Sequence, residues 1–225
     1  SVKENRALIK AVDIGAGTGI FTKCLADASI KRIAAVEPND DMRKAGIQFL
    51  GEEVKFLNGR AENTGIENAN FNLVTMASSF HWSKTYDALK EFDRLLTPDG
   101  IFSALWNPRL TDRSVCESEI QTLLSQKYGV TSRVSSGLSG ITLELHEILN
   151  NCGIFSSVVY AEAIDVVQRS REEYIGAWRS VYDIQTQLGR EKFSEFIKDV
   201  EKIISTYDCI EVHYLTRAWI ARKKN

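Results

Sequence analysis

The sequence lacks the features that mark a metal-binding, disulfide-bonded or membrane-spanning chain. None of its four cysteines lies in a CxxC pair, and its three histidines are far apart, which speaks against a structural zinc site and a disulfide framework. No apolar run approaches the length of a membrane span, and the N-terminus has no signal-peptide core. We therefore expect no metal, no membrane and, because free thiols suit a reducing compartment, a cytoplasmic location.

A strong charge of one sign is also missing. The 225 residues carry a formal net charge of −2, and no strongly basic run precedes the short tail Arg222-Lys223-Lys224. Proteins that bind nucleic acid usually carry a basic field, so we expect a small-molecule partner and no nucleic acid. The 44% of apolar and 26% of charged residues are typical of a globular protein with a substantial core. We expect a monomer or a homodimer.

The first half of the chain alternates strand and helix signals. Apolar runs predict strands at 11–14, 33–36, 54–57, 71–77 and 101–106, and helical spacing occurs at 20–28, 40–50 and 86–96. In the first of these helices the spacing puts Ile20 on the buried face. Strands separated by helices predict an α/β fold, a Rossmann-like and mainly parallel sheet with helices on both faces.

The second half is richer in helices. Helical segments are predicted at 114–128, 142–151, 171–187 and 190–206, strands at 158–167 and 212–221, a tight turn at 97–100, and a mobile loop rich in serine and glycine at 131–140. No linker is long enough to require a second independent domain. We therefore expect one domain that covers residues 1–225.

A glycine-rich turn is the most informative motif. It reads Val12-Asp13-Ile14-Gly15-Ala16-Gly17-Thr18-Gly19 and lies between the first predicted strand and the first predicted helix. Glycines allow positive φ and let a ligand approach the backbone, although an ordinary tight turn explains them equally well. A dinucleotide fingerprint would need glycine where Ile20 stands, and the lysine of a phosphate-binding loop is missing, which disfavours a nicotinamide-dependent oxidoreductase.

An acidic residue ends the second predicted strand. A carboxylate at the position of Glu37 can accept hydrogen bonds from both hydroxyls of a ribose. The alternative is a solvated glutamate ahead of the turn residue Pro38. We favour the ribose role because Glu37 follows a buried strand next to the glycine turn.

These motifs resemble those of class I S-adenosylmethionine-dependent methyltransferases. The family has an acidic residue, a spacer and G-x-G-x-G, an acid after strand two, and an acidic segment after strand three, which Gly59-Arg60-Ala61-Glu62 resembles. The resemblance covers residues 9–107 and implies S-adenosylmethionine as cofactor. The contacts it implies lie in the glycine turn, after strand two, after strand three and at the end of strand four: Asp13, Gly15, Ala16, Gly17, Thr18, Glu37, Pro38, Met42, Ala61, Glu62, Met76, Ala77 and Ser78. For Glu62 the alternative is a surface carboxylate.

The segment after the fourth strand resembles one branch of the family. Phe80-His81-Trp82, with Trp106 after strand five, is similar to trans-aconitate methyltransferase-like enzymes, which act on small molecules and often on carboxylates. Asn72 departs from the family, which usually has Asp there.

His81 is a candidate general base, since the pKa of a histidine lies near neutrality. It is at least as plausible that His81 orients its loop or lines the cofactor pocket, and it is also a candidate substrate-binding residue. Trp82 and Trp106 are candidate substrate-binding residues, as pocket or core aromatics.

Substrate contacts are also candidates in the second half. Helical spacing would put Tyr174, Trp178 and Tyr182 on one face, either as an aromatic wall over the acceptor or, more commonly, as a core stripe. Arg179 beside them is a candidate for an acidic substrate, with exposure to water as the alternative.

The resemblance implies a division of labour along the chain. We expect a cofactor-binding half at 1–110, helical inserts at 111–153 and 168–208 that form a substrate cap, and an antiparallel last strand in a seven-stranded sheet. The family's N-terminal helical segment has only Ser1 to Lys10 available here. The expected function is methyl transfer to an oxygen of a small molecule, such as a carboxylate or hydroxyl, by in-line displacement. The alternatives are an RNA or protein methyltransferase on the same fold and a non-catalytic nucleotide-binding module.

Overall fold

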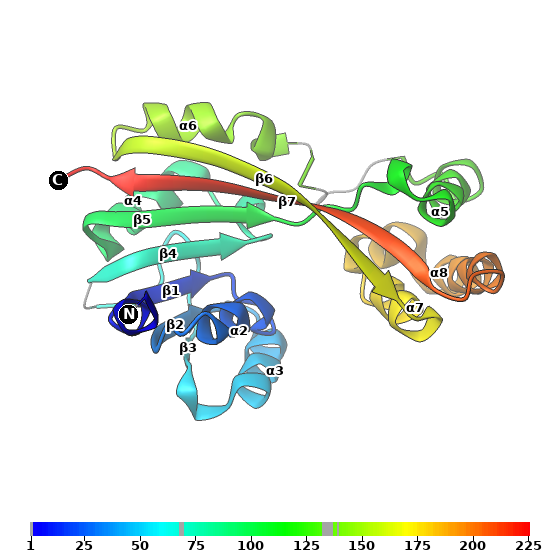
Figure 1. The fold of residues 1–225 in the computed structure, drawn as a ribbon, viewed down its shortest axis with the longest axis horizontal. Coiled ribbons are helices and arrows are strands. Elements are labelled where there is room, and N and C mark those ends of the chain that lie inside the picture. Colours follow the sequence, from blue (N-terminus) through cyan, green and yellow to red (C-terminus); the bar gives the residue numbers. More distant parts are fainter. Residues whose placement is uncertain (1, 68–69, 132–136, 139) are drawn as a thin grey trace. The chain divides into compact units, whose positions relative to one another are not determined.

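The fold was analysed in a computed structural model, which describes residues 2–67, 70–131, 137–138 and 140–225 (Figure 1). The chain forms two compact units. The first contains residues 1–106, 140–161 and 217–225, and the second contains 107–139 and 162–216. The long strands β6 (Phe155–Arg169) and β7 (Ile210–Lys223) contribute residues to both.

The first unit is built on a sheet with strand order β3-β2-β1-β4-β5-β7-β6 (Figure 1). The remaining strands are β1 (Lys10–Ile14), β2 (Arg32–Val36), β3 (Lys55–Leu57), β4 (Phe71–Ala77) and β5 (Leu96–Trp106). Strands β1 to β5 pair in parallel, and β7 is antiparallel to β5. The predicted Rossmann-like, mainly parallel seven-stranded sheet with an antiparallel last strand is confirmed.

Helices lie on both faces of this sheet. On one face, α4 (Thr85–Leu95) and α6 (Leu145–Asn151) bury Phe92 and Leu149 in a core that includes Val12 of β1. On the other face, α2 (Ile20–Asp27) buries Leu25 in a core that includes Ala11. Successive residues of β1 thus enter opposite cores, which explains why its apolar run is continuous. The other described helical segments of this unit are α1 (Val2–Ala7), α3 (Asp40–Leu50), η1 (Gly51–Glu53), η2 (Phe80–Trp82) and η4 (Gly140–Leu143).

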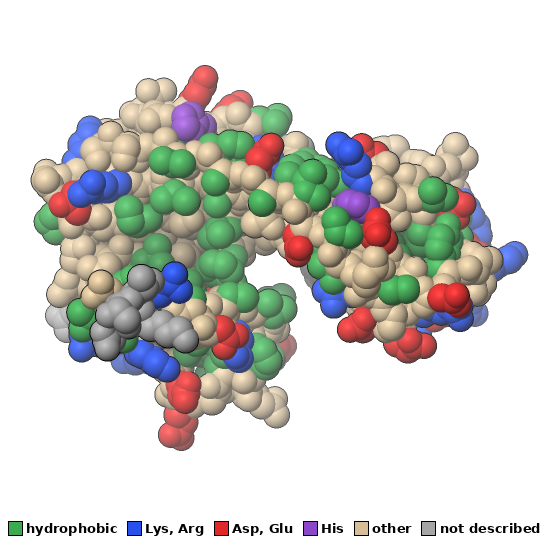
Figure 2. Space-filling model, viewed as in Figure 1, with side chains coloured by type: hydrophobic (Ala, Val, Ile, Leu, Met, Phe, Trp, Pro, Cys, Tyr) green, Lys and Arg blue, Asp and Glu red, His purple; other side chains and the backbone are tan. Residues whose placement is uncertain are grey.

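The helix cover on the second face is incomplete. Figure 2 shows apolar side chains gathered over the part of the sheet built by β5, β7 and β6, where Figure 1 draws the strands without a helix in front of them. Val159 of β6 is 56% exposed, and Ile220 of β7 is 36% exposed. The expectation of helices on both faces therefore holds for β1 and β2 more fully than for the distal strands.

Two local predictions need correction. The predicted turn at 97–100 lies inside β5, where Asp99 has a φ of 61° and the pairing of β4 with β5 shifts register. A bulge absorbs these turn residues without ending the strand. In α2, the buried side chains are Thr22 and Leu25, whereas Ile20 is 71% exposed.

The second unit has its own hydrophobic core. It contains η3 (Thr111–Arg113), α5 (Val115–Gln126), α7 (Arg171–Arg179) and α8 (Tyr182–Ile204). Ile120 of α5, Trp178 of α7 and Phe196 of α8 are all buried in this core. A capping box at Ser170 starts α7, with Glu173 as its partner, which satisfies backbone donors at the helix end.

The helix boundaries in this unit differ from the prediction. The helix predicted at 171–187 is broken after Arg179, where α7 ends. Helix α8 begins at Tyr182, and Gly189, with a φ of 70°, makes a kink inside it. Tyr182 therefore does not share a helix with Tyr174. Hydrophobic periodicity missed this break because the apolar pattern continues across both helices.

The unit boundaries differ from the predicted inserts 111–153 and 168–208. Helix α6 belongs to the first unit because Leu145 and Leu149 are fully buried with the strands of that unit. Of the loop predicted at 131–140, residues 132–136 and 139 lie outside the described part of the chain.

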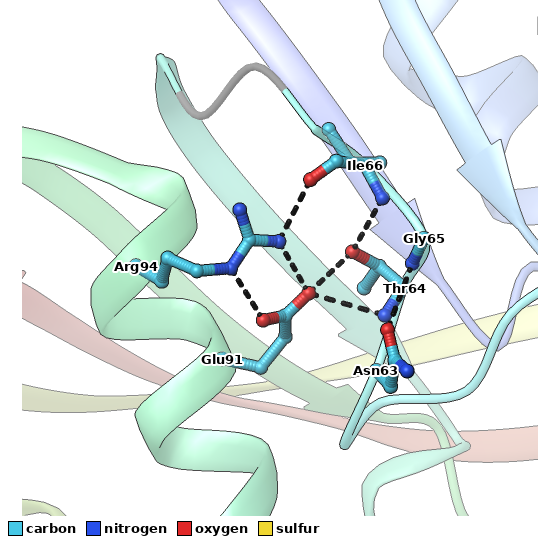
Figure 3. A network of polar contacts seen from close by, with 6 residues as sticks. All are labelled: Asn63, Thr64, Gly65, Ile66, Glu91 and Arg94. Carbon is cyan, nitrogen blue, oxygen red and sulfur yellow. Dashed lines mark hydrogen bonds and ion pairs between the residues drawn. The ribbon is translucent and has the colours of Figure 1, made fainter.

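A buried polar network ties the loop after β3 to α4 (Figure 3). Glu91 Oε1 accepts the Thr64 N–H over 3.1 Å and the Thr64 hydroxyl over 2.5 Å. Arg94 Nε donates to Glu91 Oε2 over 2.7 Å, and Arg94 Nη2 donates to the Ile66 carbonyl over 2.8 Å. Burial by itself raises the pKa of Glu91, but hydrogen bonds from Arg94 and Thr64 outweigh it, and the pKa is lowered.

Replacing Glu91 with alanine should lower the free energy of unfolding by ~1–3 kcal/mol at pH 7, because buried donors on Thr64 lose their acceptor. The lowered pKa means that this contribution is present above the ordinary pKa of 4.5 and is lost as pH falls through the folded-state value. Urea denaturation at pH 7 measures the loss of unfolding free energy, and urea denaturation at acidic pH measures how much of it remains. The control is Asp87→Ala on the same helix, whose exposed ion pair with Lys90 is 3.7 Å long and should contribute less than ~0.5 kcal/mol. Equal losses in both variants would contradict this role of Glu91.

Candidate functional site

A cleft of about 610 Å³ lies in the first unit at the carboxyl ends of the parallel strands. This is where open α/β sheets bind ligands, and the volume lies within the usual range for ligand pockets. All the residues predicted to contact a cofactor line it: Asp13, Gly15, Ala16, Gly17, Thr18, Glu37, Pro38, Met42, Ala61, Glu62, Met76, Ala77 and Ser78. The fold thus brings four separate segments of the sequence to one cavity.

The cleft also has lining residues that the sequence did not indicate. They are Ile20, Phe21, Arg60, Ser79 and Ser83. Each of them lies close in sequence to the glycine turn, to Glu62 or to the Phe-His-Trp segment. In the sequence, only this proximity could have indicated that they line the cleft.

The glycine turn adopts the conformation that its glycines predict. Gly15, Gly17 and Gly19 have φ values of 69°, 58° and 86°, which only glycine adopts without strain. A Cβ on Gly15 would come within 2.6 Å of the Ser79 Cβ, so this glycine is required by packing. A Cβ on Gly17 would meet no protein atom within 4 Å and would enter the cleft.

Glu37 joins the end of β2 to this turn. Its Oε2 accepts the Gly17 N–H over 2.8 Å, and its Oε1 accepts the Asn39 N–H over 2.8 Å. The side chain is 6% exposed and lines the cleft. Since each carboxylate oxygen has two lone pairs, both oxygens can still accept hydroxyl donors from a ligand. Glu37 thus lies at the cleft and directly after strand two, as the sequence predicted.

Asp13 is a second carboxylate on the wall of the cleft. It is 1% exposed, and it accepts the hydroxyl of Thr22 over 2.6 Å and that of Thr75 over 2.9 Å. Burial raises the pKa of Asp13 to about 6, although these two hydroxyls lower it. A buried carboxylate that accepts hydrogen bonds from two neutral hydroxyls provides a favourable place for a cationic group of a ligand.

The loop after β3 brings Arg60 and Glu62 to the cleft. Arg60 and Asn63 exchange backbone hydrogen bonds of 2.9 and 3.1 Å, which turns the chain tightly around Ala61. Glu62 Oε1 accepts the Lys84 N–H over 2.6 Å at the start of α4. Glu62 is thus more constrained than a free surface carboxylate. At the start of β4, Asn72 Oδ1 accepts the Lys10 N–H over 3.0 Å, so Asn72 joins β4 to β1.

Residues at the end of β4 turn sharply into η2. Ser78 has a φ of 50°, an uncommon conformation for a residue with a side chain, and its N–H donates to the Leu105 carbonyl over 2.7 Å. Ser79 donates its hydroxyl to the Ile14 carbonyl over 2.9 Å and thereby joins this turn to β1.

The three substrate-binding candidates of the first unit occupy different positions. Trp82 lines the cleft and is 70% exposed. Trp106 is 2% exposed in the core and does not line the cleft, and neither does His81. Burial lowers the pKa of His81, so its imidazole is neutral at physiological pH.

The candidates of the second unit have structural partners. Trp178 is 3% exposed and packs against Phe196 in that unit's core, as the core alternative predicted. Arg179 donates to Glu201 Oε1 over 2.8 Å, and its side chain is 60% exposed.

A charged cluster that the sequence did not indicate lies nearby in the second unit. The buried Glu117 carboxylate pairs with Arg109 at 3.4 Å and accepts the Tyr174 hydroxyl, while Arg109 stacks over Trp178. Burial and the charge of Glu117 raise the pKa of Tyr174.

Within the described residues, no cluster of three or more histidine, cysteine or acidic side chains could hold a metal ion. In the same part of the chain, no helix has the length and apolarity needed to cross a membrane. What the cleft offers is a set of carboxylates and backbone groups suited to a ligand with hydroxyls and positive charge.

Comparison with known proteins agrees with this chemistry. A sequence profile described as "Methyltransferase domain" matches residues 12–104, which contain the glycine turn, Glu37 and β4. This part of the first unit is therefore similar to a methyltransferase domain.

Two curated relatives of the chain are described as uncharacterised methyltransferases. A methyltransferase-like protein of Schizosaccharomyces pombe is 33% identical over 98 residues, which are 44% of this chain and 38% of that protein. A methyltransferase of Mycobacterium tuberculosis is 31% identical over 100 residues, which are 44% and 40% of the two chains. The chain therefore spans about two fifths of the length of the curated relatives it matches.

Solved structures show the same methyltransferase fold at low identity. A candidate type II methyltransferase from Anaeromyxobacter dehalogenans superposes with a TM-score of 0.64 at 16% identity, over 96% of this chain and 89% of that one. A Haemonchus contortus phosphoethanolamine N-methyltransferase in complex with S-adenosylmethionine has a TM-score of 0.52 at 17% identity, over 100% and 51% of the two chains. The cofactor to test against the geometry of the cleft is therefore S-adenosylmethionine.

The cleft fits such a cofactor in two respects. A Cβ on Gly17 would meet no protein atom within 4 Å, and the carboxylates of Asp13 and Glu37 both line the cleft. S-adenosylmethionine carries an ammonium, a sulfonium and a ribose diol, which are the groups that such carboxylates bind.

Replacing Asp13 with asparagine should stabilise the folded protein above pH 6. Because the folded-state pKa is raised from 3.8 to about 6, the folded state binds more protons than the unfolded state between these values, and wild-type stability falls as pH rises through that window. The neutral variant avoids this cost, on the order of 1–3 kcal/mol at pH 8, and loses its advantage near pH 4. Thermal or urea unfolding at both pH values tests this, with Asp27→Asn at an exposed ion pair as control. An advantage of the same size at pH 4 and pH 8 would contradict the raised pKa.

Proposed function

We propose that this chain transfers the methyl group of S-adenosylmethionine to an oxygen of a small molecule by in-line displacement. The observation that carries the proposal is the hydrogen bond between Gly17 and Glu37 on the wall of the cleft. It holds the two groups proposed to bind the methionine and ribose ends in one fixed arrangement. Such preorganisation lowers the cost of ordering a flexible ligand.

In this proposal each segment binds one part of the cofactor. The turn from Gly15 to Thr18 and the Asp13 carboxylate bind the amino-acid end, and Glu37 binds the ribose hydroxyls. Pro38 and Met42 pack beside the sugar and base. Ala61 and Glu62 meet the adenine, and Met76, Ala77 and Ser78 lie along the side of β4. In this arrangement the residues at the end of β4 would hold the sulfonium end, because β4 lies next to β1 and on the side away from β3 in the strand order.

The bound cofactor supplies an electrophilic methyl group on a sulfonium that is a good leaving group. The methyl carbon would accept a lone pair from the acceptor oxygen while the electron pair of the carbon–sulfur bond stays on sulfur, and a hydroxyl acceptor would release its proton to water. The chain contributes mainly alignment and exclusion of water, and alignment alone supplies up to ~7–11 kcal/mol in favourable models. Because water takes the proton of a hydroxyl acceptor and an ionised oxygen has none to lose, the proposal assigns no proton transfer to His81.

The second unit is proposed to supply the substrate cap. The support is its connection to the sheet: it begins at Asn107, directly after the carboxyl end of β5, where acceptors of such folds bind. Under this proposal Trp178 and Arg179 affect which acceptor is selected through the structure of the cap, and not by contact with the acceptor. Whether the acceptor is a carboxylate of the kind used by trans-aconitate methyltransferase-like enzymes is a matter for turnover measurements.

The alternatives differ in measurable ways. An RNA methyltransferase would shift RNA in a gel, with an affinity that falls steeply as salt rises. A non-catalytic module would bind S-adenosylhomocysteine and show no turnover with phenolic, carboxylic or amine acceptors.

Replacing Gly17 with alanine should abolish binding of S-adenosylhomocysteine in titration calorimetry. The added methyl group enters the cleft, and the positive φ costs ~1–2 kcal/mol of stability. The matched control is Gly153→Ala, because Gly153 also has a positive φ and open space around its Cβ but lies outside the cleft. The control should lose similar stability and keep wild-type affinity. Absence of binding to the wild-type protein, or equal affinity in both variants, would overturn the proposed cofactor site.

A further inference from the structure

Large apolar side chains remain exposed along the cleft, although burial would normally hide them. Ile20 is 71% exposed, Met42 is 49% exposed and Trp82 is 70% exposed, and all three line the cleft. Met42 belongs to α3, Ile20 begins α2 after the glycine turn, and Trp82 ends η2, which follows β4. Exposed apolar groups gathered at a cleft mark a binding surface more often than chance exposure does.

Trp82 is held in place by a chain of aromatic rings that reaches the core. Its ring lies 4.8 Å from the ring of His81, and the His81 ring lies 6.3 Å from that of Trp106. Trp106 is 2% exposed and packs edge-on against Trp219 at 5.5 Å. The indole of Trp82 is exposed, but His81 and Trp106 connect it to the core and restrict its movement.

The hydrogen bond in this chain determines what His81 can do. Trp106 Nε1 donates to His81 Nδ1 over 3.4 Å. An indole N–H only donates, so His81 Nδ1 is unprotonated, and in the neutral imidazole the proton is on Nε2. Nε2 is buried, and within the described residues it has no hydrogen-bond partner. The nitrogen that could accept a proton is therefore already occupied, and the ring does not line the cleft.

The charges of the cleft limit the acceptor. Among the described lining residues, the ionisable groups are the carboxylates of Asp13, Glu37 and Glu62 and the guanidinium of Arg60. Arg60 lies on the loop after β3, beside Glu62. Three of these four groups are carboxylates, and the one cation among the described lining residues is next to Glu62, so the cleft disfavours an acceptor that carries a negative charge.

We infer that Trp82 contacts the methyl acceptor, that His81 and Trp106 position its indole, and that the acceptor is an uncharged molecule with a flat apolar face. This inference rests on the proposed function, because it assumes that the cofactor occupies the neighbouring part of the cleft. It assigns His81 a positioning role and makes Trp82 the residue that determines acceptor class. A planar acceptor stacks on the indole and presents its hydroxyl toward the sulfonium end.

Ligand-observed NMR on the full chain saturated with S-adenosylhomocysteine tests the acceptor class. The probes are two matched pairs, 4-hydroxybenzamide with 4-hydroxybenzoate and indole with indole-3-carboxylate. We expect the uncharged member of each pair to bind more tightly. We expect Trp82→Ala to weaken that binding roughly fivefold to tenfold and Trp82→Phe to keep most of it, because an aromatic contact contributes about that factor. Tyr86→Ala is the matched control, since Tyr86 is 65% exposed and lies outside the cleft.

Variants of His81 separate positioning from proton transfer. His81→Phe keeps a ring under Trp82 but removes the acceptor of the Trp106 N–H, whereas His81→Asn keeps an acceptor and removes the ring. If the ring supports Trp82, His81→Phe retains probe binding better than His81→Asn. In ¹⁵N spectra of histidine-labelled protein, His81 should show an unprotonated Nδ1 whose signal shifts in Trp106→Phe. A protonated Nδ1 would overturn the positioning role.

The outcomes distinguish this inference from the proposed function. If the protein fails to bind S-adenosylhomocysteine in calorimetry, the proposed function fails, and the inference fails with it. If the cofactor product binds but the charged probes bind as well as the uncharged ones, only the inference is overturned. The same holds if no probe binds, or if Trp82→Ala binds as the wild type does.

Discussion

The site depends on one hydrogen bond between two neighbouring parallel strands. Strands β1 and β2 pair in register, with Ile14 opposite Val36, so the chain leaves both strands at the same level of the sheet. Gly17 then donates its N–H to the carboxylate of Glu37, and the N–H groups of Gly15 and Ala16 donate to the Val36 carbonyl. Because glycine alone adopts this turn without strain, the loop and the acid form one rigid corner of the cleft.

A cost in stability accompanies this corner. Asp13 is buried with two hydroxyl partners, and a charged carboxylate in that position is less favourable than the same group in water. Proteins retain such groups where function needs them, and a cationic ligand would offset the cost of burying the charged Asp13 carboxylate. By contrast, Glu91 obtains enough hydrogen bonds from Thr64 and Arg94 for its pKa to be lowered, so it stabilises the loop beside the cleft.

Aromatic and charged side chains serve different ends in the two units. In the first, the rings of Trp106 and His81 connect the core to the exposed Trp82. In the second, Trp178 lies in the core, and the buried pair of Glu117 with Arg109 provides polar contacts within it. A buried pair of this kind specifies an arrangement of side chains more than it adds stability.

The sequence alone determined the sheet, the glycine turn and most of the residues that line the cleft, because apolar runs, glycine spacing and strand-end acids are local signals. It could not place His81 outside the cleft, Arg179 in an ion pair with Glu201, or α6 in the first unit. It also missed the break before Tyr182 and the cluster around Glu117. These features depend on which faces of separate elements meet, and periodicity within one element carries no information about its partner. Only the tertiary structure decided them.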